Sequence, residues 1–207
     1  MKTLLKTARI TALASALLLP GALLSAGMLI VTPAQAAPEK YVLDTENVHA
    51  FIQFKIKHLG FSWLLGRFDT FKGEFTLDKD KIESSSVSVD IDVASLNSNH
   101  AERDKHLRGD DFFAVEKFPK ATFTSTKVEK TGDKTANIHG NLTLKGITKP
   151  VTLAATYIGG GDDPWGGHRQ CFEATTEIVL KDFGIDYNLG PSAQSAQIYI
   201  SVEGIRK

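Results

Sequence analysis

Three polar residues on one short predicted helix are the residues of this chain best suited to proton-transfer chemistry. Arg103, Asp104 and His106 fall within His100 to Arg108, which reads as a helix ending near Gly109. An aspartate in contact with a histidine can hold and transfer a proton. The alternative is a solvated helix face, whose charges pair locally at about 0.3–0.5 kcal/mol each. The sequence leaves both interpretations open.

Nothing in the sequence completes a catalytic mechanism around this group. The chain has no Gly-x-Ser-x-Gly elbow, phosphate-binding glycine loop or His-Glu-x-x-His pair, which argues against hydrolase, nucleotide-binding and zinc-protease classes. We therefore predict no catalytic residues and no cofactor. The histidines are scattered and only two share an element, so no metal site is predicted. They are His49, His58, His100, His106, His139 and His168.

Cys171 is the single cysteine, so no internal disulfide can form. By strand alternation it shares the polar face with Glu173, Thr175 and Glu177. Such acidic surroundings raise a thiol pKa and disfavour the nucleophilic thiolate. We expect a bystander thiol, with a disulfide-linked dimer as the alternative.

An apolar segment between two glycines interrupts the otherwise polar loops of the chain. From His58 to Phe68 it carries six large apolar side chains, of which Leu59 is the first, and no acidic residue. We expect a loop or short helix that forms the wall or lid of a ligand chamber, together with Asp111-Phe112-Phe113 and Phe118. The alternative is a plug that packs into one end of the core. The five that follow Leu59 are Phe61, Trp63, Leu64, Leu65 and Phe68.

The composition places the chain among ordinary globular proteins. Of its 207 residues, 42% are hydrophobic and 23% charged, and 24 basic residues balance 24 acidic ones. A chain without net positive charge has no field to hold nucleic acid, so no nucleic-acid partner is predicted. Long alternating strand edges are compatible with a homodimer.

The first 36 residues resemble a cleavable secretory signal. Lys2, Lys6 and Arg9 precede an uncharged stretch from Ile10 to Pro38, and Ala34-Gln35-Ala36 forms a small-x-small cleavage site. We expect cleavage before Ala37 and a periplasmic chain of 207 − 36 = 171 residues. The alternative is a retained membrane anchor. The mature chain carries 24 − 3 = 21 basic and 24 acidic residues, a net charge of −3.

Apolar residues alternate with a period of two through most of the mature chain, which is typical of half-buried strands. We predict an all-β fold with eight principal strands, a short ninth at Tyr41 to Asp44, and one helix capped by Asn99 with Glu102. Short loops favour antiparallel neighbours, and we favour a barrel over a sandwich. The runs are Ala50 to Lys57, Phe68 to Leu77, Val87 to Ala94, Ala121 to Val128, Ala136 to Leu144, Val151 to Tyr157, Phe172 to Leu180 and Gln197 to Ile205.

Small residues recur on the faces predicted to point into the barrel, which indicates that bulky residues do not fill the lumen. An eight-stranded barrel can be filled by side chains or can hold one ligand. The small inward residues are Ala50, Gly73, Ala121, Gly140, Ala155, Ala174 and Gly204.

An ordered series of short motifs is similar to that of the YceI-like family of exported, lipocalin-like proteins described as polyisoprenoid-binding. It spans nearly the whole of residues 37–207, which we treat as one domain. The motifs are His58-Leu59-Gly60, Gly66-Arg67-Phe68, Ser95-Leu96-Asn97, Arg103-Asp104-Lys105-His106-Leu107, Asp111-Phe112-Phe113, Phe118-Pro119-Lys120-Ala121-Thr122-Phe123, Gly140-Asn141-Leu142-Thr143-Leu144, Gly146-Ile147-Thr148-Lys149-Pro150-Val151 and Asp182-Phe183-Gly184-Ile185.

The resemblance implies an extended eight-stranded antiparallel barrel around an elongated hydrophobic cavity, and no established catalytic activity. The family often has His-Ser where this chain has His49-Ala50, which places a polar role for His49 in doubt. The predicted ligand is a long-chain isoprenoid, such as a polyprenyl lipid or quinone, or a similar amphiphile. The predicted ligand-binding residues are Phe54, Ile56, His58, Phe61, Trp63, Leu64, Phe68, Phe71, Phe75, Ile91, Arg103, His106, Phe112, Phe123, Leu142 and Phe183.

The leading functional hypothesis is a periplasmic carrier or store for such a lipid, with transient contact to a membrane or membrane protein. Arg103, His106 and His58 are the candidates for contacting the ligand head group at the mouth of the barrel. The first alternative is an enzyme acting on the lipid through Asp104 and His106. The second is a stress-related exported protein whose barrel is a filled core.

Overall fold

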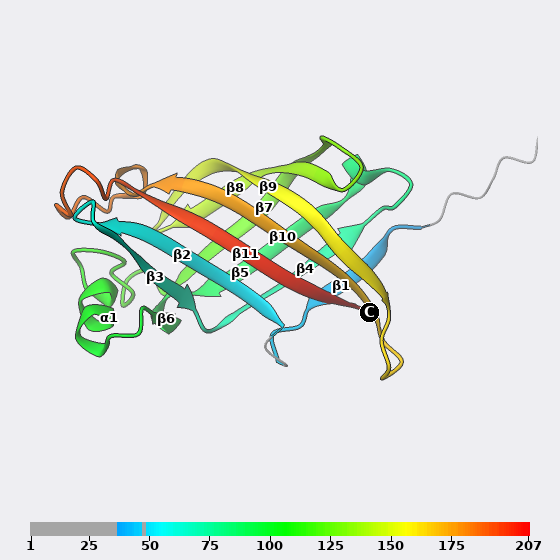
Figure 1. Cartoon of the computed structure of the whole chain (residues 1–207), viewed down its shortest axis with the longest axis horizontal. Helices are drawn as coiled ribbons and strands as arrows, with labels where there is room; N and C mark the ends of the chain where they lie inside the picture. The colour runs from blue at the N-terminus through cyan, green and yellow to red at the C-terminus, as the bar shows by residue number, and fades with distance from the viewer. Residues whose placement is uncertain (1–36, 47–48) are drawn as a thin grey trace, which may run out of the picture. The chain divides into compact units, whose positions relative to one another are not determined.

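The computed structural model describes residues 37–46 and 49–207, which form an antiparallel β-barrel with one α-helix (Figure 1). The predicted signal segment lies outside the described residues. Within the described part of the chain, no helix is long and apolar enough to span a bilayer. The strands are β1 (Glu39–Leu43), β2 (Ala50–His58), β3 (Ser62–Phe68), β4 (Phe71–Leu77), β5 (Ser86–Asp92), β6 (Leu96–Asn97), β7 (Lys120–Lys130), β8 (Thr135–Leu144), β9 (Ile147–Asp162), β10 (His168–Val179) and β11 (Ser195–Arg206).

The helical elements are the α-helix α1 (Ala101–Arg108) and three 3₁₀ turns, η1 (Ile82–Ser84), η2 (Val93–Ser95) and η3 (Leu180–Phe183). Eight strands close the ring in the order β1-β4-β5-β7-β8-β9-β10-β11, and β1 pairs back to β11. Strand β2 continues along β11 where β1 ends, and β3 and then β6 are added beside it. The predicted eight-stranded antiparallel barrel is therefore confirmed.

Side-chain alternation and its interruptions explain which faces point inward. In β7, Ala121 and Phe123 are buried, and the register then shifts between Ser125 and Lys127. Such a bulge inserts one extra residue and turns the following side chains to the other face. Val128 is therefore buried although it lies an odd number of residues from Phe123.

The segment from His58 to Phe68 is not a loop or short helix, as the sequence suggested, but a hairpin into β3. Leu59 and Gly60 both have positive φ, 53° and 80°, as the two central residues of a type I′ turn require. The predicted strand from Phe68 to Leu77 is consequently two strands that break at Asp69 and Thr70. The alternation was hidden because β3 is apolar on both of its faces.

The helix begins as predicted but is capped by a different side chain. His100 is the N-cap, and its Nδ1 atom accepts the amide of Arg103 at 3.2 Å. Asn99 instead has a φ of 63°, and its amide bonds to Asn97, so the predicted capping box with Glu102 does not form.

Buried side chains pack at the two ends of the barrel. One cluster, including Val93, Phe112 and Phe183, lies where α1 covers one end. The other contains Tyr41 and Phe75, whose rings stack with centroids 4.9 Å apart. Between these packed ends the small cluster that holds Phe123 is bordered by open space rather than by a continuous core.

Candidate ligand cavity

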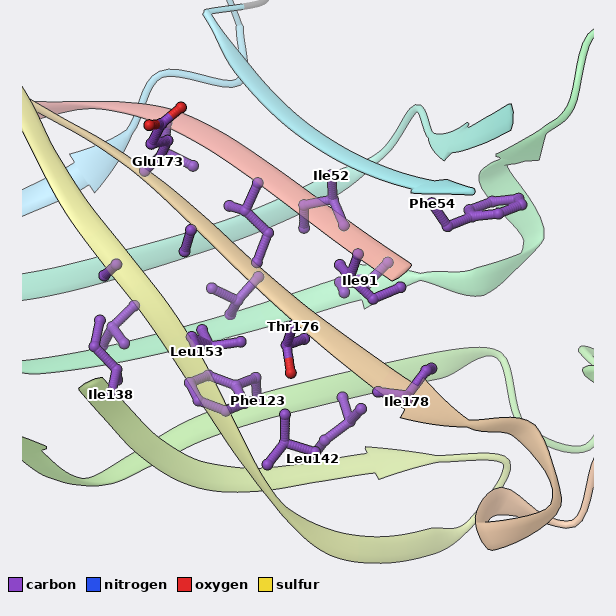
Figure 2. Close-up of a pocket in the computed structure, with 18 of the residues that line it drawn as sticks. Ile52, Phe54, Ile91, Phe123, Ile138, Leu142, Leu153, Glu173, Thr176 and Ile178 are labelled. Carbon is purple, nitrogen blue, oxygen red and sulfur yellow. The ribbon is translucent and has the colours of Figure 1, made fainter. Parts of the chain in front are cut away.

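A cavity of about 1220 Å³ runs through the barrel between the packed ends. Figure 2 shows its central wall, to which β2, β5, β7, β8, β9 and β10 each contribute apolar side chains. Glu173 and Thr176 are the polar residues labelled in this view, and further hydroxyl side chains lie elsewhere in the lining. A cavity this large and apolar suits a hydrophobic ligand rather than a small polar metabolite.

Twelve of the sixteen predicted ligand-binding residues line this cavity. They come from four strands of one side of the barrel, from α1 and its following loop, and from the facing strands β7 and β8. These residues are Phe54, Ile56, His58, Leu64, Phe68, Phe75, Ile91, Arg103, His106, Phe112, Phe123 and Leu142.

Four predicted residues lie elsewhere. Phe61 and Trp63 are 87% and 41% exposed, because the turn and the outer face of β3 carry them away from the lumen. Phe71 and Phe183 are buried within the two packed end clusters and do not reach the cavity. Part of the predicted lid lines the cavity and the rest does not. The residues that line it are Leu64, Phe68, Phe112 and Phe113, and those that do not are Phe61, Trp63, Leu65 and Phe118.

Among the small residues predicted to point inward, only three alanines border the open space of the cavity. Ala121, Ala155 and Ala174 line the cavity. At Gly140 an added Cβ would meet Phe123 Cζ at 2.4 Å, and at Gly204 it would meet Phe75 Cε1 at 2.3 Å. Neighbouring rings thus fill the space beside those two glycines. At Gly73 an added Cβ would instead meet the backbone oxygen of Ser88 at 2.7 Å and Leu43 Cδ1 at 2.9 Å. Ala50 belongs to a packed cluster instead.

A large share of the wall on the far strands was not predicted from the sequence. The signal was present, because these residues occupy the inward phase of runs that were correctly predicted as strands. The additional apolar lining residues include Ile138, Val151, Leu153, Tyr157, Phe172, Ile178, Ile198, Ile200 and Val202.

The cavity reaches exposed residues at both ends of the barrel. At the α1 end its lining includes His58, Leu59 and Tyr187, all exposed. At the opposite end it includes Asp133 and Lys134 of the β7–β8 turn (Figure 1). A flexible tail would thus have an entrance without unfolding of the barrel.

The charged group on α1 holds the chain around Ser98 in place. Asp104 is buried and accepts the amide of Ser98 at 2.8 Å and also its hydroxyl. Arg103 donates from Nε to the Ser98 hydroxyl at 2.7 Å and from Nη2 to its carbonyl at 2.6 Å. His106 bonds instead to Asp111 at 3.1 Å. Asp104 and His106 therefore do not form the proton-transfer pair that the sequence left open.

His106 belongs to an aromatic group at the mouth. Its ring meets Phe112 and Tyr187 edge-on, at centroid distances of 5.0 and 5.2 Å, and all three residues line the cavity. Arg103 lines it as well. The mouth thus offers an imidazole, a guanidinium and a phenol beside an apolar interior.

Comparison with known proteins shows to which family this chain belongs. The family model for the YceI-like domain matches residues 41–204. The chain belongs to the YceI-like family. A UPF0312 protein of Azotobacter vinelandii is 53% identical over 93% of this chain and 97% of its own length. Protein YceI of Salmonella arizonae is 52% identical over 86% of this chain and 93% of its own length.

Solved structures of similar proteins show the same barrel. A Campylobacter jejuni YceI protein superimposes with a TM-score of 0.64 at 31% identity, over 74% of this chain and 91% of its own. Burkholderia cenocepacia BcnA gives a TM-score of 0.69 at 24% identity, over 78% of this chain and 98% of its own. A polyisoprenoid binding domain from Saccharophagus degradans gives 0.59 at 16% identity, over 81% and 98%.

This YceI-like domain also has polar atoms in the cavity wall that the sequence did not indicate. Gln170, 5% exposed, lies 3.1 Å from His168 Nε2, and His168 Nδ1 lies 2.7 Å from Asp162. Both Gln170 and His168 line the cavity. Their inward positions on β10 follow from its alternation.

Glu39 ties the first strand to three partners at this end. Lys79 and Tyr41 approach it at 2.7 Å each and Arg206 at 2.8 Å. These bonds, that from Lys79 first, lower the pKa of Glu39 from 4.5 to about 2 against the opposing effect of burial. Burial, reinforced by Glu39, raises the pKa of Tyr41 to about 12.

The contacts of Glu39 predict that part of the free energy of unfolding is lost at acidic pH. Because its pKa is lower when folded, the stabilisation is present above about pH 4.5 and lost as the pH falls towards about 2. The shift sets an upper limit of about 3 kcal/mol, which solvent screening at a carboxylate with 26% exposure reduces. Denaturant unfolding across this range should show a shallower acid decline in Glu39→Gln than in the wild type. Parallel declines would contradict this.

An ion cluster lies beside this end of the barrel. Arg169 Nη1 contacts Asp44 at 2.7 Å and Glu203 at 2.8 Å, and His49 Nδ1 lies 3.2 Å from Asp44. His49 thus has a polar role despite the alanine that follows it. Asp44, His49 and Glu203 are residues of types that bind metal ions, and their ligand atoms lie within 4.8 Å of one another. The guanidinium of Arg169, however, already bonds to both carboxylates. The cluster fits an ion-pair network better than a cation site.

Cys171 lies on the outer side of β10 and forms no disulfide. Partial burial, followed by the charge of Glu203, raises its pKa above the ordinary value. The direction agrees with the sequence-based expectation, although the acidic neighbour is Glu203 on β11 rather than the glutamates of its own strand.

Proposed function

We propose that the protein is a periplasmic carrier or store that shelters the tail of a long-chain isoprenoid in its barrel cavity. The observation that carries this proposal is the apolar cavity of about 1220 Å³. The similarity to the Saccharophagus degradans protein, a polyisoprenoid binding domain, supports the same ligand class. No chemical change of the ligand is required for this role.

The cavity volume is consistent with a long tail. If each carbon occupies roughly the 30 Å³ of a liquid water molecule, one five-carbon isoprene unit needs about 150 Å³. A cavity of about 1220 Å³ then holds on the order of eight units. Tails much longer than this would extend beyond the barrel, so cavity depth would select tail length.

Binding must be moderated if the ligand is to be released. At about 0.8 kcal/mol per buried CH₂, one isoprene unit contributes up to about 4 kcal/mol. About five such units would already reach the practical affinity limit near −18 to −21 kcal/mol. Ordering of the chain and an imperfect fit offset much of this gain. The wide, sparsely polar cavity suits such loose, non-directional binding.

We assign head-group contacts to the mouth. His58, His106 and Arg103 surround the α1 end of the cavity. The Arg103 guanidinium is already bonded to Ser98, so it is held in a fixed orientation. The two imidazoles can donate or accept hydrogen bonds, which suits a quinone oxygen or an alcohol.

Extraction of the purified protein tests this function. The protein is isolated without detergent from the periplasmic fraction and extracted with organic solvent, and the extract is analysed by mass spectrometry. We expect a prenyl lipid or isoprenoid quinone in the extract. We also expect the mass of the protein to match a chain whose first residue is Ala37. Recovery of no lipid, together with failure to take up an added polyprenyl alcohol, would contradict the carrier role. An intact residue 1–36 segment would contradict export by cleavage.

A further inference from the structure

Four large apolar side chains project from the hairpin that joins β2 and β3. Leu59, Phe61, Trp63 and Leu65, here called the hairpin patch, are 60%, 87%, 41% and 62% exposed. The hairpin lies at the barrel end that also carries α1 and the β10–β11 loop (Figure 1). Large contiguous apolar surfaces on a globular domain mark interaction sites.

The barrel does not need these side chains for its own packing. The inward residues of the same hairpin, Phe54 and Leu64 among them, line the cavity, and Leu59 borders it at the turn, while Phe61, Trp63 and Leu65 point outward. Leu59 adopts a positive φ of 53°, which is unusual for a bulky residue. A polar Asn or Gly suits such a turn position better. The exposed leucine therefore occupies this turn position against the local backbone preference.

The hairpin is basic although the domain is acidic. From Ala50 to Phe68 it contains Lys55, Lys57 and Arg67 and no acidic residue, whereas residues 37–207 carry 21 basic and 24 acidic side chains. The ammonium groups of Lys55 and Lys57 lie 4.7 and 4.2 Å from the Trp63 ring centroid. Neither lysine has a carboxylate partner among the described residues. Their charge is thus presented outward beside the apolar patch.

The patch is continuous with the mouth of the cavity. Lys57, His58 and Leu59 belong both to the hairpin and to the cavity lining. The turn also contacts the β10–β11 loop, since a Cβ at Gly60 would lie 3.1 Å from Ser192 Oγ. Whatever binds the patch therefore lies next to the opening through which a tail would pass.

We propose that the hairpin patch docks the protein onto an anionic lipid bilayer and brings the cavity mouth to the membrane surface. Aromatic rings favour the interface between head groups and acyl chains, and lysines beside them favour anionic head groups. A basic aromatic tip that borders a lipid-sized cavity is complementary to this partner in both charge and polarity. The inference rests on the proposed tail-binding function for its purpose, but the docking itself can be tested without any ligand.

Vesicle sedimentation tests the docking. The purified protein is mixed with vesicles of phosphatidylcholine alone, or with about a third of phosphatidylglycerol added. We expect binding to the anionic vesicles that weakens with salt, and little binding to the zwitterionic ones. Phe61→Ser with Leu65→Ser should lower the partition coefficient at least tenfold. Lys55→Gln with Lys57→Gln should lower it about twenty-fivefold, at roughly fivefold per lysine.

Matched control variants separate this surface from general stickiness. Trp165 is 80% exposed on the β9–β10 hairpin at the other end, so Trp165→Ser removes an aromatic of comparable exposure. Lys40→Gln with Lys72→Gln removes two exposed lysines from β1 and β4. Both controls should bind anionic vesicles as the wild type does. Equal losses in the controls and the patch variants would overturn the proposal.

The remaining outcomes distinguish docking from ligand binding. Phe61→Ser with Leu65→Ser should retain the lipid content of the wild type, because neither side chain lines the cavity, but should transfer a fluorescent prenyl lipid between vesicles at least tenfold more slowly. A wild type that holds lipid and binds no vesicle would overturn docking and leave tail binding intact. A patch-dependent dimer without vesicle binding would likewise overturn it. Vesicle binding by a protein that takes up no lipid would sustain docking and reject the carrier role.

Discussion

Replacing Ala155 and Ala174 together by phenylalanine should lower the amount of co-purified lipid at least tenfold while the barrel remains folded. The two alanines face each other across β9 and β10 and both line the cavity. Their new rings would occupy space that a tail otherwise takes. A ring that fills an existing void needs no rearrangement of its neighbours, so we expect a loss of stability below about 1 kcal/mol.

Ala50 provides the matched control for this prediction. It is as buried as Ala155, at 5% against 7% exposure, but lies in the packed cluster around Tyr41 and Phe75 rather than beside the cavity. Ala50→Phe should therefore destabilise the protein by roughly 1–3 kcal/mol through overpacking. Denaturant unfolding of Ala155→Phe and Ala50→Phe compares the same substitution at both sites. Equal destabilisation would indicate a filled interior and contradict the carrier role.

The strands and the barrel class were predictable because their physical signal is local. In β5, Val87, Val89 and Ile91 alternate with serine and aspartate, and such a run has one stable arrangement, with its apolar face inward. Eight such runs with short loops favoured a barrel over a sandwich, and the family resemblance implied the same barrel. Strand β3 was not predicted from the sequence because Trp63 and Leu65 make its outer face apolar as well. A residue placed outward for docking removes the alternation by which a strand is recognised.

The boundary of the cavity was less predictable than the strands that form it. Phe75 and Phe123 line the cavity, whereas Phe71 and Phe183 pack against the ends, although all four are phenylalanines in apolar surroundings. Which rings border open space depends on where neighbouring rings turn. Gly140 illustrates this, because the ring of Phe123 fills the volume that the glycine leaves. Alternation identifies the face of a residue but not the depth of its packing.

Asp104→Ala should be the most damaging single change on α1, although it removes no lipid contact. The carboxylate is buried and accepts both the amide and the hydroxyl of Ser98, itself 3% exposed. Without it those donors remain buried, and the Ser98 contacts of Arg103 lose their common anchor. Leaving buried hydrogen-bonding groups unpaired costs about 1–3 kcal/mol, and more where a charged partner is lost. We expect a decrease of about 2–4 kcal/mol in the free energy of unfolding.

His106→Ala separates this structural role from the alternative of catalysis. The imidazole is about half exposed and its bond to Asp111 lies at the surface, so its removal should cost less than about 1 kcal/mol. An enzyme that used Asp104 and His106 together would lose turnover equally in both variants, even where the folded fraction is matched. A scaffold role instead predicts that Asp104→Ala lowers stability and Asp104→Asn, which keeps one acceptor oxygen, restores part of it. Because the two side chains bond to different partners, we expect the scaffold result, with the lipid content of the Asp104 variants unchanged per folded molecule.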